Sequence, residues 1–385
     1  MSRENKKIRV GFVGAGWMGS EQLRRLAARE DVEVVALCEL NAERGQAVLD
    51  EIGLKNTRLV SDFGELVGDA TIDTIWLVSP NAHHGPQSIA ALEAGKHVFC
   101  EKPASIRFEE HLRQVELAKA NPQQRTFVDY ILNFDSFEQR LRKMIADGAF
   151  GKVTQMQVNY RHAVNIAGDK VWKLKREVMG DAIGMGINHA VSVLLFAMSS
   201  QAKPAKVYAT SMPAQVRPFE ADPIWNLHIT FDNDACGFVF GDIDFGNGYD
   251  AYHNVKGTEG GLIFDSQLDR PAKIRYWNKD LANKKWLYPL DPQRCAADGV
   301  EPWPADTTTP DSGDVIEHQT GSAVAHFIES IQTGTPSPLS FDLSATVAEV
   351  GWAAQVSALT GEPVSLPLDA ERAKTILSKV FQPQA

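Results

Sequence analysis

The sequence predicts an α/β protein in which a doubly wound parallel sheet is followed by a second domain with an open, mainly antiparallel sheet. Short apolar runs alternate with helical segments from Ile8 to about Val128, and runs with a period of two residues follow after Asn133. A chain of 385 residues has the length for two domains. We therefore predict one domain over residues 1–128 and a second over residues 129–385.

The first domain is predicted from the regular alternation of strands and helices. The predicted strands are Ile8–Gly14, Val32–Leu40, Thr71–Pro80, His97–Pro103 and Gln124–Ile131. The predicted helices are Ser20–Glu30, His84–Gly95 and Glu109–Asn121. Such alternation requires right-handed crossovers, so it indicates a parallel sheet with helices on both faces.

The second domain is predicted from period-two runs, which are typical of strands with one covered face. The predicted strands are Lys152–His162, Ala205–Met212, Ile224–Phe231, Cys236–Phe245 and Lys273–Trp277, with helices at Phe137–Gly148, Gly321–Gly334 and Leu343–Gly361. The segment Asp291–Gly313 is rich in Pro, Asp and Thr, which predicts an irregular surface loop. We expect an open mixed or antiparallel sheet, with room for the C-terminal helices to pack back on the first domain.

Composition excludes several classes of protein. Lys and Arg total 39 and Asp and Glu total 49, so the net charge of −10 disfavours binding to nucleic acid or anionic membranes. No window approaches the roughly 18 uninterrupted apolar residues of a membrane helix, and the N-terminus lacks the pattern of a signal peptide. The 4 cysteines lie far apart without a CxxC pair, so we expect no metal site, no disulfide framework and a cytoplasmic location.

The stretch GAGWMG fits the pattern G-x-G-x-x-G at the expected place, between a strand and a helix. Its glycines permit a tight turn and a close approach of the backbone to a pyrophosphate, which the helix N-terminus stabilises. We predict a Rossmann dinucleotide site here. The predicted contacts are Gly14, Gly16, Trp17, Met18 and Gly19.

Glu39 ends the second strand, 20 residues after Gly19. An acid at this position accepts hydrogen bonds from the adenosine ribose and repels a 2′-phosphate, so NAD is favoured over NADP. Arg44 lies close enough in sequence to keep NADP open as the alternative cofactor. A solvated glutamate at a strand end is the structural alternative.

The turn SPNAHHG follows the strand Thr71–Pro80 at the carboxyl edge of the predicted sheet. A ligand crevice is expected at this edge, so the turn is predicted to line it. The predicted cofactor contacts are Ser79, Pro80, Asn81 and His84. Polar residues are also common in turns that bind nothing, which is the alternative.

The segments GAGWMG, PNAHH and ALEAGKHVFCEKP resemble the glucose-fructose oxidoreductase, inositol dehydrogenase and MocA (Gfo/Idh/MocA) family of NAD(P)-dependent oxidoreductases. The resemblance extends to GAFGKVTQMQVNYR at the entry to the second domain and to SALTGEPVSLP near the C-terminus. It implies that Lys102 of the EKP step contacts substrate and assists proton transfer, and that Glu101 lies with it at the cofactor. A lysine that marks the end of a buried strand is the alternative.

The second family signature is a helix start in which an aspartate and a histidine accompany the lysine. The matching stretch here is MGDAIGMGINHAVS. His189 takes the histidine position, whereas Met185 and Ser192 stand where acids are expected. Asp181 is a poor replacement, since eight helical residues rise about 12 Å. We expect His189 to act as a base or hydrogen-bond partner; a packed helix histidine is the alternative.

These residues predict an NAD(P)-dependent oxidoreductase, a dehydrogenase or reductase that acts on a secondary hydroxyl or ketone. The resemblance implies a small polyhydroxylated substrate, such as a sugar, cyclitol or derivative. An exposed sheet face on strands such as Cys236–Phe245 leads us to expect a homodimer or homotetramer. Two alternatives stay open: a glycoside hydrolase that uses NAD for transient oxidation, and an NAD-binding protein without catalysis. The candidate substrate contacts are Tyr160, Lys170, Trp172, Met185 and His189.

Overall fold

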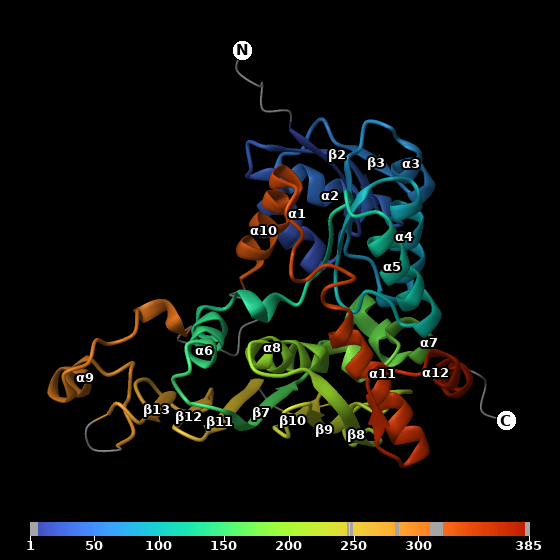
Figure 1. Cartoon of the computed structure of the whole chain (residues 1–385). Coiled ribbons are helices and arrows are strands. Elements are labelled where there is room, and N and C mark those ends of the chain that lie inside the picture. The colour runs from blue at the N-terminus through green and yellow to red at the C-terminus, as the bar shows by residue number, and fades with distance from the viewer. Residues whose placement is uncertain (1–6, 245, 247–248, 282–284, 309–318, 382–385) are drawn as a thin grey trace. The chain divides into compact units, whose positions relative to one another are not determined.

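The chain folds into two compact units in a computed structural model that describes residues 7–244, 246, 249–281, 285–308 and 319–381 (Figure 1). The first unit comprises residues up to Tyr130, Val178–Gly180 and Gln319–Thr346. The second unit comprises Ile131–Glu177, Asp181–His318 and Val347–Ala385. The helix predicted at Gly321–Gly334 therefore belongs to the first unit.

The first unit contains a six-stranded sheet in the order β3-β2-β1-β4-β5-β6. Its strands are β1 (Ile8–Val13), β2 (Val32–Cys38), β3 (Arg58–Val60), β4 (Thr74–Leu77), β5 (His97–Cys100) and β6 (Thr126–Val128). Every neighbouring pair is parallel. This strand order is that of a Rossmann fold, with its ligand crevice at the carboxyl ends of the strands. The predicted doubly wound sheet is confirmed.

Helices cover the sheet on both faces. They are α1 (Trp17–Ala27), α2 (Ala42–Ile52), α3 (Phe63–Gly68), α4 (Asn81–Glu93), α5 (Phe108–Ala120) and α10 (Thr320–Thr333). Figure 1 shows α10 beside α1 and α5 beside α4, with the strands between the two pairs. The late segment also borders β6, because Leu339 O accepts a hydrogen bond from Val128 N at 2.9 Å.

An aromatic cluster forms the centre of this unit. The rings of Trp76 and Phe99 stack with centroids 3.9 Å apart, and Phe127 continues the stack at 5.0 Å from Phe99. Phe327 of α10 meets Trp76 edge-on at 5.5 Å. Because aromatic side chains bury large apolar areas, this contact explains why a helix from late in the chain belongs to the first unit.

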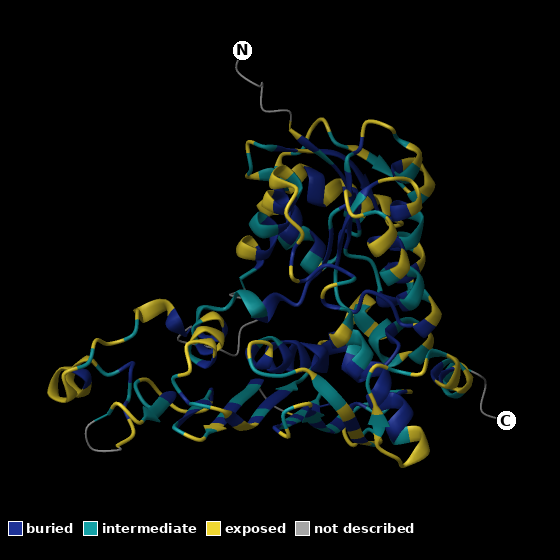
Figure 2. Ribbon diagram, in the orientation of Figure 1, coloured by how far each residue is buried: buried dark blue, intermediate teal, exposed yellow. Residues whose placement is uncertain are grey.

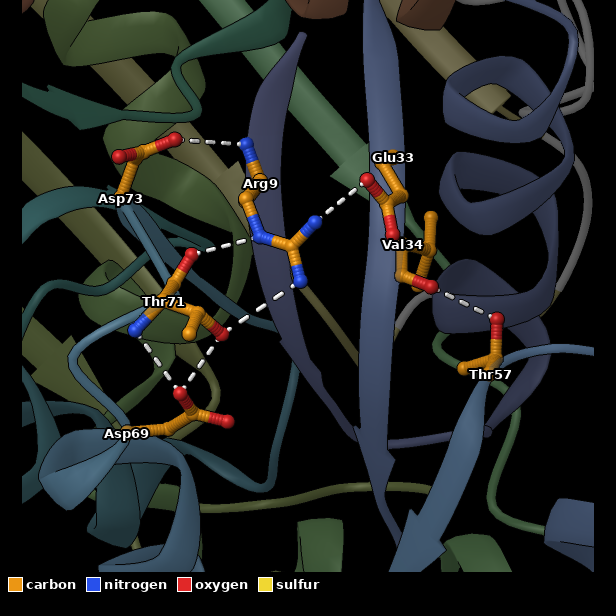
Figure 3. Close-up of polar contacts among 7 residues, drawn as sticks. All are labelled: Arg9, Glu33, Val34, Thr57, Asp69, Thr71 and Asp73. Atoms are coloured by element: carbon orange, nitrogen blue, oxygen red, sulfur yellow. Dashed lines mark hydrogen bonds and ion pairs between the residues drawn. The ribbon is translucent and has the colours of Figure 1, made fainter.

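The amino ends of β1, β2 and β4 are held by a polar network around Arg9 (Figure 3). The backbone N of Arg9 donates to Asp73 at 2.9 Å, and its guanidinium bonds Glu33 at 2.6 Å and the carbonyl of Thr71 at 2.8 Å. Asp69 accepts from both the N–H and the hydroxyl of Thr71. This edge lies opposite the carboxyl ends of the strands, so its charges serve the fold.

Lys96 of the AGKHV run is a second structural cation. It is buried, and its ammonium donates to the carbonyls of Asp69 at 2.7 Å and Ile72 at 2.8 Å. Gln124 in turn donates to the carbonyls of Leu92 and Lys96, both at 2.9 Å. The lysine of this run therefore fixes the loop before β4.

The second unit is built on an eight-stranded sheet in the order β13-β12-β11-β7-β10-β9-β8-β14. Its strands are β7 (Val153–His162), β8 (Pro204–Met212), β9 (Ile224–Phe231), β10 (Cys236–Asp242), β11 (Tyr249–Gly257), β12 (Gly260–Asp265), β13 (Ile274–Asn278) and β14 (Val364–Ser365). Only the β7–β10 pair is parallel among the named strands. The predicted open, mainly antiparallel sheet is confirmed.

One face of this sheet is covered by helices. The helices of the unit are α6 (Ser136–Ala146), α7 (Arg176–Met179, of which the last two residues belong to the first unit), α8 (Asn188–Met198), α9 (Pro292–Asp298), α11 (Ala345–Thr360) and α12 (Ala370–Leu377). Strands β9 and β10 alternate between buried and half-buried residues, and α8 is almost wholly buried (Figure 2). Gly241 permits the close approach, since a Cβ there would lie 2.4 Å from Ile187.

The sequence prediction was wrong about Asp291–Gly313, which contains α9. Asp291 caps this helix through the N–H groups of Gln293 and Arg294, Pro292 takes its first turn, and Gly299 ends it at φ 68°. A short 3-10 helix follows at Ala305–Thr307. These local signals of a helix were hidden by the Pro- and Asp-rich composition, because the same residues favour loops. Residues 309–313 lie outside the described part.

Several elements were not predicted, namely α2, β3, α3, β11, β12, β14 and α12. The strand predicted at Cys236–Phe245 ends at Asp242, and Phe245 lies outside the described residues. Among the helices that are described, none is long and apolar enough to span a membrane. The 4 cysteines are free thiols.

Candidate active site

The glycine-rich turn follows β1 and has the shape that a dinucleotide requires. Gly14 has φ 96°, and a Cβ there would lie 2.5 Å from the carbonyl O of Val78. A Cβ on Gly19 would lie 2.1 Å from the carbonyl O of Gly14. A Cβ on Gly16 would meet no atom within 4 Å, so the turn is open there. The first and third glycines thus serve the turn, and the second leaves space for a pyrophosphate.

Helix α1 begins directly at this turn, and its first turn suits an anion. Gly16 is the N-cap, no side chain caps the helix, and no acidic residue lies in its first turn. Trp17 is exposed and Met18 is half-buried at the same end. Because helix N-termini present free N–H groups and a positive dipole end, these residues fit a dinucleotide phosphate.

Glu39 follows β2 and is 6% exposed. Its carboxylate accepts hydrogen bonds from Ala15 N at 2.8 Å, Asn41 N at 2.8 Å and the Arg44 guanidinium at 2.7 Å. Burial raises the pKa of Glu39, but these hydrogen bonds outweigh it and hold the pKa below its usual value. The acid is therefore ionised beside the glycine-rich turn, and Arg44 is its ion-pair partner.

The turn Ser79–His84 is held by bonds to the protein. Asn81 donates to the carbonyl of Met179 at 2.8 Å, and the hydroxyl of Ser79 donates to Gln87 at 2.7 Å. The ring nitrogens of His84 lie 2.7 Å from Pro103 O and 2.6 Å from Ser79 O. Burial lowers the pKa of His84 to about 4, so the ring is neutral.

These bonds give Asn81 and His84 a structural role in shaping the turn, with Pro80 as the N-cap of α4. His84 also ties the turn to the EKP step through Pro103. A contact of these residues with the cofactor stays a prediction.

Lys102 follows β5 at the carboxyl edge of the sheet. Burial lowers its pKa, while the carboxyl groups of Glu101 and Asp129 act in the opposite direction. The backbone N of Lys102 also donates to Glu101 at 3.2 Å. Burial and the two neighbouring acids therefore act on the pKa of the lysine in opposite directions, and the net effect lowers it.

Sequence reasoning missed two members of this cluster, Gln22 and Asp129. The amide of Gln22 donates to Glu101 at 2.7 Å and to Asp129 at 3.1 Å. Gln22 lies in the predicted helix Ser20–Glu30 and Asp129 in the predicted strand Gln124–Ile131, and the two residues are 0% and 1% exposed. The acid within an apolar strand was a signal, but the partners of Gln22 lie 79 and 107 residues away in the chain.

His189 belongs to the second unit, on the first turn of α8, and is 5% exposed. Its ring lies 5.6 Å from the ring of Tyr160, centroid to centroid. Tyr160 also meets His162 at 6.1 Å and Tyr249 at 5.6 Å. The structure thus groups two predicted residues, His189 and Tyr160, and adds His162 and Tyr249, which were not predicted.

Met185 lies in a π-helical turn, Ile183–Ile187, that leads into α8. It is 9% exposed, and the next residue, Gly186, would place a Cβ 3.0 Å from the Tyr160 ring. Such π-turns are frequent at functional sites. The hydroxyl of Ser192, at the other expected acid position, donates to His189 O and accepts from Asn133.

Asp181 has a structural role, as its sequence distance from His189 suggested. It caps the π-turn by accepting from Gly184 N at 2.8 Å and bonds Gln355 at 3.0 Å. The second unit places several acids near Tyr249, among them Asp135, whose pKa burial raises to about 8. Its charge also acts on Tyr249.

Lys170 and Trp172 lie in a 3-10 helix, Gly168–Leu174, that contains no buried residue. Lys173 lies over the Trp172 ring at 5.9 Å. Both predicted substrate contacts are half-buried. Their role toward substrate stays a prediction. Within the described residues, no group of His, Cys, Asp and Glu side chains is arranged to hold a metal ion.

Two family profiles match the chain along most of its length. Residues 8–130 match "Oxidoreductase family, NAD-binding Rossmann fold", and residues 139–263 match "GFO/IDH/MocA C-terminal domain". A 1,5-anhydro-D-fructose reductase of Ensifer adhaerens is 30% identical over 269 residues, which cover 66% of this chain and 75% of that protein. The chain belongs to the Gfo/Idh/MocA family of oxidoreductases. Its first unit is an NAD-binding Rossmann domain.

Other members of the Gfo/Idh/MocA family are similar in sequence or fold. An inositol 2-dehydrogenase of Salmonella paratyphi B is 27% identical over 254 residues, covering 66% of this chain and 72% of that enzyme. A levoglucosan dehydrogenase in complex with NADH and levoglucosan superposes with a TM-score of 0.77 and 23% identity, covering 94% of this chain and 100% of that chain. At that identity the structural likeness shows the shared fold.

Proposed function

We propose that this protein is an NAD-dependent dehydrogenase or reductase that acts on a secondary hydroxyl or ketone of a sugar, cyclitol or sugar derivative. One observation carries the proposal: a half-buried lysine, Lys102, lies beside Glu101 at the carboxyl edge of an NAD-binding sheet. The substrate class is supported by the relatives, which include an inositol dehydrogenase and an anhydrofructose reductase.

Bound NAD(H) supplies the chemistry of hydride transfer at its nicotinamide ring. The chain's own contribution is to place and polarise the reacting oxygen. An ammonium group on Lys102 donates a hydrogen bond to a ketone oxygen or to a developing alkoxide, which stabilises negative charge there. Neutral Lys102 accepts the hydroxyl proton in the oxidative direction. The lowered pKa of Lys102 makes loss of its proton easier than for an exposed lysine.

His189 is proposed as the second group that takes or relays the substrate proton. A neutral imidazole accepts a proton near neutral pH without an adjacent acid. Its ring is packed beside the ring of Tyr160, at 5.6 Å between ring centroids. Tyr160 and Met185 are proposed to border the substrate there.

The test is oxidation of a panel of polyols, cyclitols and anhydrosugars with NAD⁺, followed by NADH absorbance. Lys102→Ala should lower the rate by about 10² to 10⁴, with NADH affinity within a few-fold of wild type. The control is Lys119→Ala, an exposed lysine of α5. Near-normal turnover by Lys102→Ala would remove the lysine from the mechanism.

The same panel separates the two alternatives. A glycoside hydrolase with transient oxidation would release free sugar without net NADH. A protein without catalysis would bind NADH and turn over no compound. Net NADH formation that depends on Lys102 supports the dehydrogenase.

The location and assembly of the protein are proposals of the same kind. Free cysteines and a net charge of −10 support a reducing cytoplasm. The half-buried face of strands such as β9 and β10 supports pairing of subunits as a homodimer or homotetramer. Light scattering of the purified protein measures the assembly directly.

A further inference from the structure

A closed polar cluster lies beside Lys102 in the first unit. It contains Gln22 of α1, Trp76 of β4, Glu101 after β5 and Asp129 after β6. The Trp76 indole N–H donates to the Gln22 amide oxygen at 2.6 Å. The Gln22 amide nitrogen donates to Glu101 Oε1 at 2.7 Å and to Asp129 Oδ2 at 3.1 Å. Residues from four elements that are far apart in the sequence thus come together around the two acids, Glu101 and Asp129.

The direction of these hydrogen bonds is fixed by Trp76. An indole N–H only donates, so the Gln22 atom that faces it must be the carbonyl oxygen. The Gln22 NH₂ group therefore faces the two carboxyl groups and gives one hydrogen to each. Neither of these hydrogens reaches Asp129 Oδ1.

In this arrangement, Asp129 Oδ1 receives no hydrogen bond from Gln22. It is buried, and no donor within the described residues reaches it. The carboxyl groups of Asp129 and Glu101 are nevertheless close neighbours, because Asp129 Oδ2 and Glu101 Oε1 both accept from the one Gln22 amide nitrogen. Two carboxylates so close to each other cannot both be ionised in a buried site, so one proton must lie between them.

We propose that Asp129 is a neutral acid that donates a hydrogen bond to Glu101 and so holds a single negative charge on Glu101 opposite Lys102. Asp129 is then a positioning residue for the lysine, and only this last role rests on the proposed function. In this state the cluster carries one negative charge, on the Glu101 carboxylate, next to the positive charge of the Lys102 ammonium group.

The proton is assigned to Asp129 because its environment is the less favourable for charge. Burial raises the pKa of Asp129 well above its usual value, and the charge and hydrogen bond of Glu101 raise it further. Burial raises the pKa of Glu101 as well, but the Lys102 charge and the hydrogen bonds from Asp129, Lys102 N and Gln22 act against it and favour the ionised form. Cys100 and Tyr130, the other titratable neighbours, have pKa values raised by burial and stay neutral.

The protonation state is tested without any substrate, by infrared spectroscopy of protein labelled with ¹³C-aspartate. Asp129→Asn should remove a protonated-carboxyl band that persists as the pH rises. Asp135→Asn is the matched control, since it removes a second, half-buried acid whose protonated band should disappear as the pH rises through its pKa of about 8. If Asp129→Asn removes no such band, Asp129 is ionised and the proposal is overturned, whatever the enzyme oxidises.

The positioning role is tested by the pH dependence of kcat/KM. Asp129→Asn retains a donor to Glu101 and an acceptor for Gln22, so it should keep the wild-type profile. Asp129→Leu removes the donor, Glu101 then binds a proton more readily, and Lys102 loses its counter-charge. The part of the kcat/KM profile that is set by the pKa of Lys102 should therefore move to lower pH by about one unit.

NADH affinity and the urea midpoint of each variant show whether it is folded. Equal shifts in folded Asp129→Asn and Asp129→Leu would overturn the positioning role. If the leucine variant does not fold, the asparagine variant decides alone. A changed pH profile in Asp129→Asn would then overturn the positioning role. An unchanged pH profile, together with loss of the protonated-carboxyl band in Asp129→Asn, would support the proposal.

Discussion

The carboxylate of Glu39 accepts a hydrogen bond from the backbone N–H of Ala15 at 2.8 Å. This bond joins the end of β2 to the glycine-rich turn after β1. Its other oxygen accepts from Asn41 N and pairs with Arg44. The acid thus shapes the turn, and we expect its negative charge to repel the 2′-phosphate of NADP.

Glu39→Ala should therefore narrow the preference for NADH over NADPH. Removal of the charge ends repulsion of the 2′-phosphate and releases the Arg44 guanidinium, which binds phosphate well. We expect the ratio of the two Kd values to fall by about tenfold or more. Fluorescence titration of both reduced cofactors measures it. Glu43→Ala, which removes an exposed acid four residues later, is the control.

The rate of substrate oxidation should rise with pH along a limb set by Lys102. The neutral amine is the form that accepts a proton, and burial lowers the pKa of Lys102 from its ordinary 10.5. The limb should therefore lie below pH 10.5 and be absent from Lys102→Ala. The reverse reaction needs the ammonium form, so its rate should fall over the same pH range. Parallel pH profiles for the two directions would contradict the assignment.

Lys96→Met should destabilise the first unit without changing the rate of the catalysed reaction. The substitution keeps the length of the buried side chain but leaves the carbonyls of Asp69 and Ile72 without their charged donor. We expect a loss of about 2–4 kcal/mol in the free energy of unfolding, measured in urea. The same change at exposed Lys119 should cost less than about 0.5 kcal/mol. Equal effects at the two sites would show that Lys96 is not a structural donor.

Met185→Asp should weaken substrate binding and change the pH-rate profile. The new carboxylate would lie at a site that is 9% exposed, beside the turn that contacts Tyr160. Burying it costs several kcal/mol unless it is paired or protonated. Met185→Leu keeps volume and polarity, so it should retain the wild-type KM and profile. If the aspartate variant also retains both, Met185 does not border the substrate.

Much of the first unit was predictable because its signals are local. Strands of four to seven apolar residues alternate with amphipathic helices, and the GAGWMG turn stands between β1 and α1. The glycines are required by contacts inside the turn itself, as the 2.1 Å approach at Gly19 shows. The family resemblance rested on the same short stretches. These features determined the fold class, the cofactor and the position of Lys102 in the chain.

The tertiary structure decided what lies around those residues. Helix α10 follows the second unit's strands in sequence, yet Phe327 packs on Trp76 of the first unit. Strand β7 pairs in parallel with β10 across some 80 residues of chain that carry no local signal of that partner. In the second unit the helix caps, rather than composition, produced α9.

The candidate site, too, depends on contacts between residues that lie far apart in the sequence. The sequence by itself predicted Lys102 and His189 as the residues of the family's chemistry, and it predicted that Met185 stands in place of an acid. Only the folded chain brings Gln22, Glu101 and Asp129 together, because hydrogen bonds form between atoms that are close in space however far apart they are in sequence. The negative charge beside Lys102 therefore depends on residues from three different elements, and no single stretch of sequence predicts it.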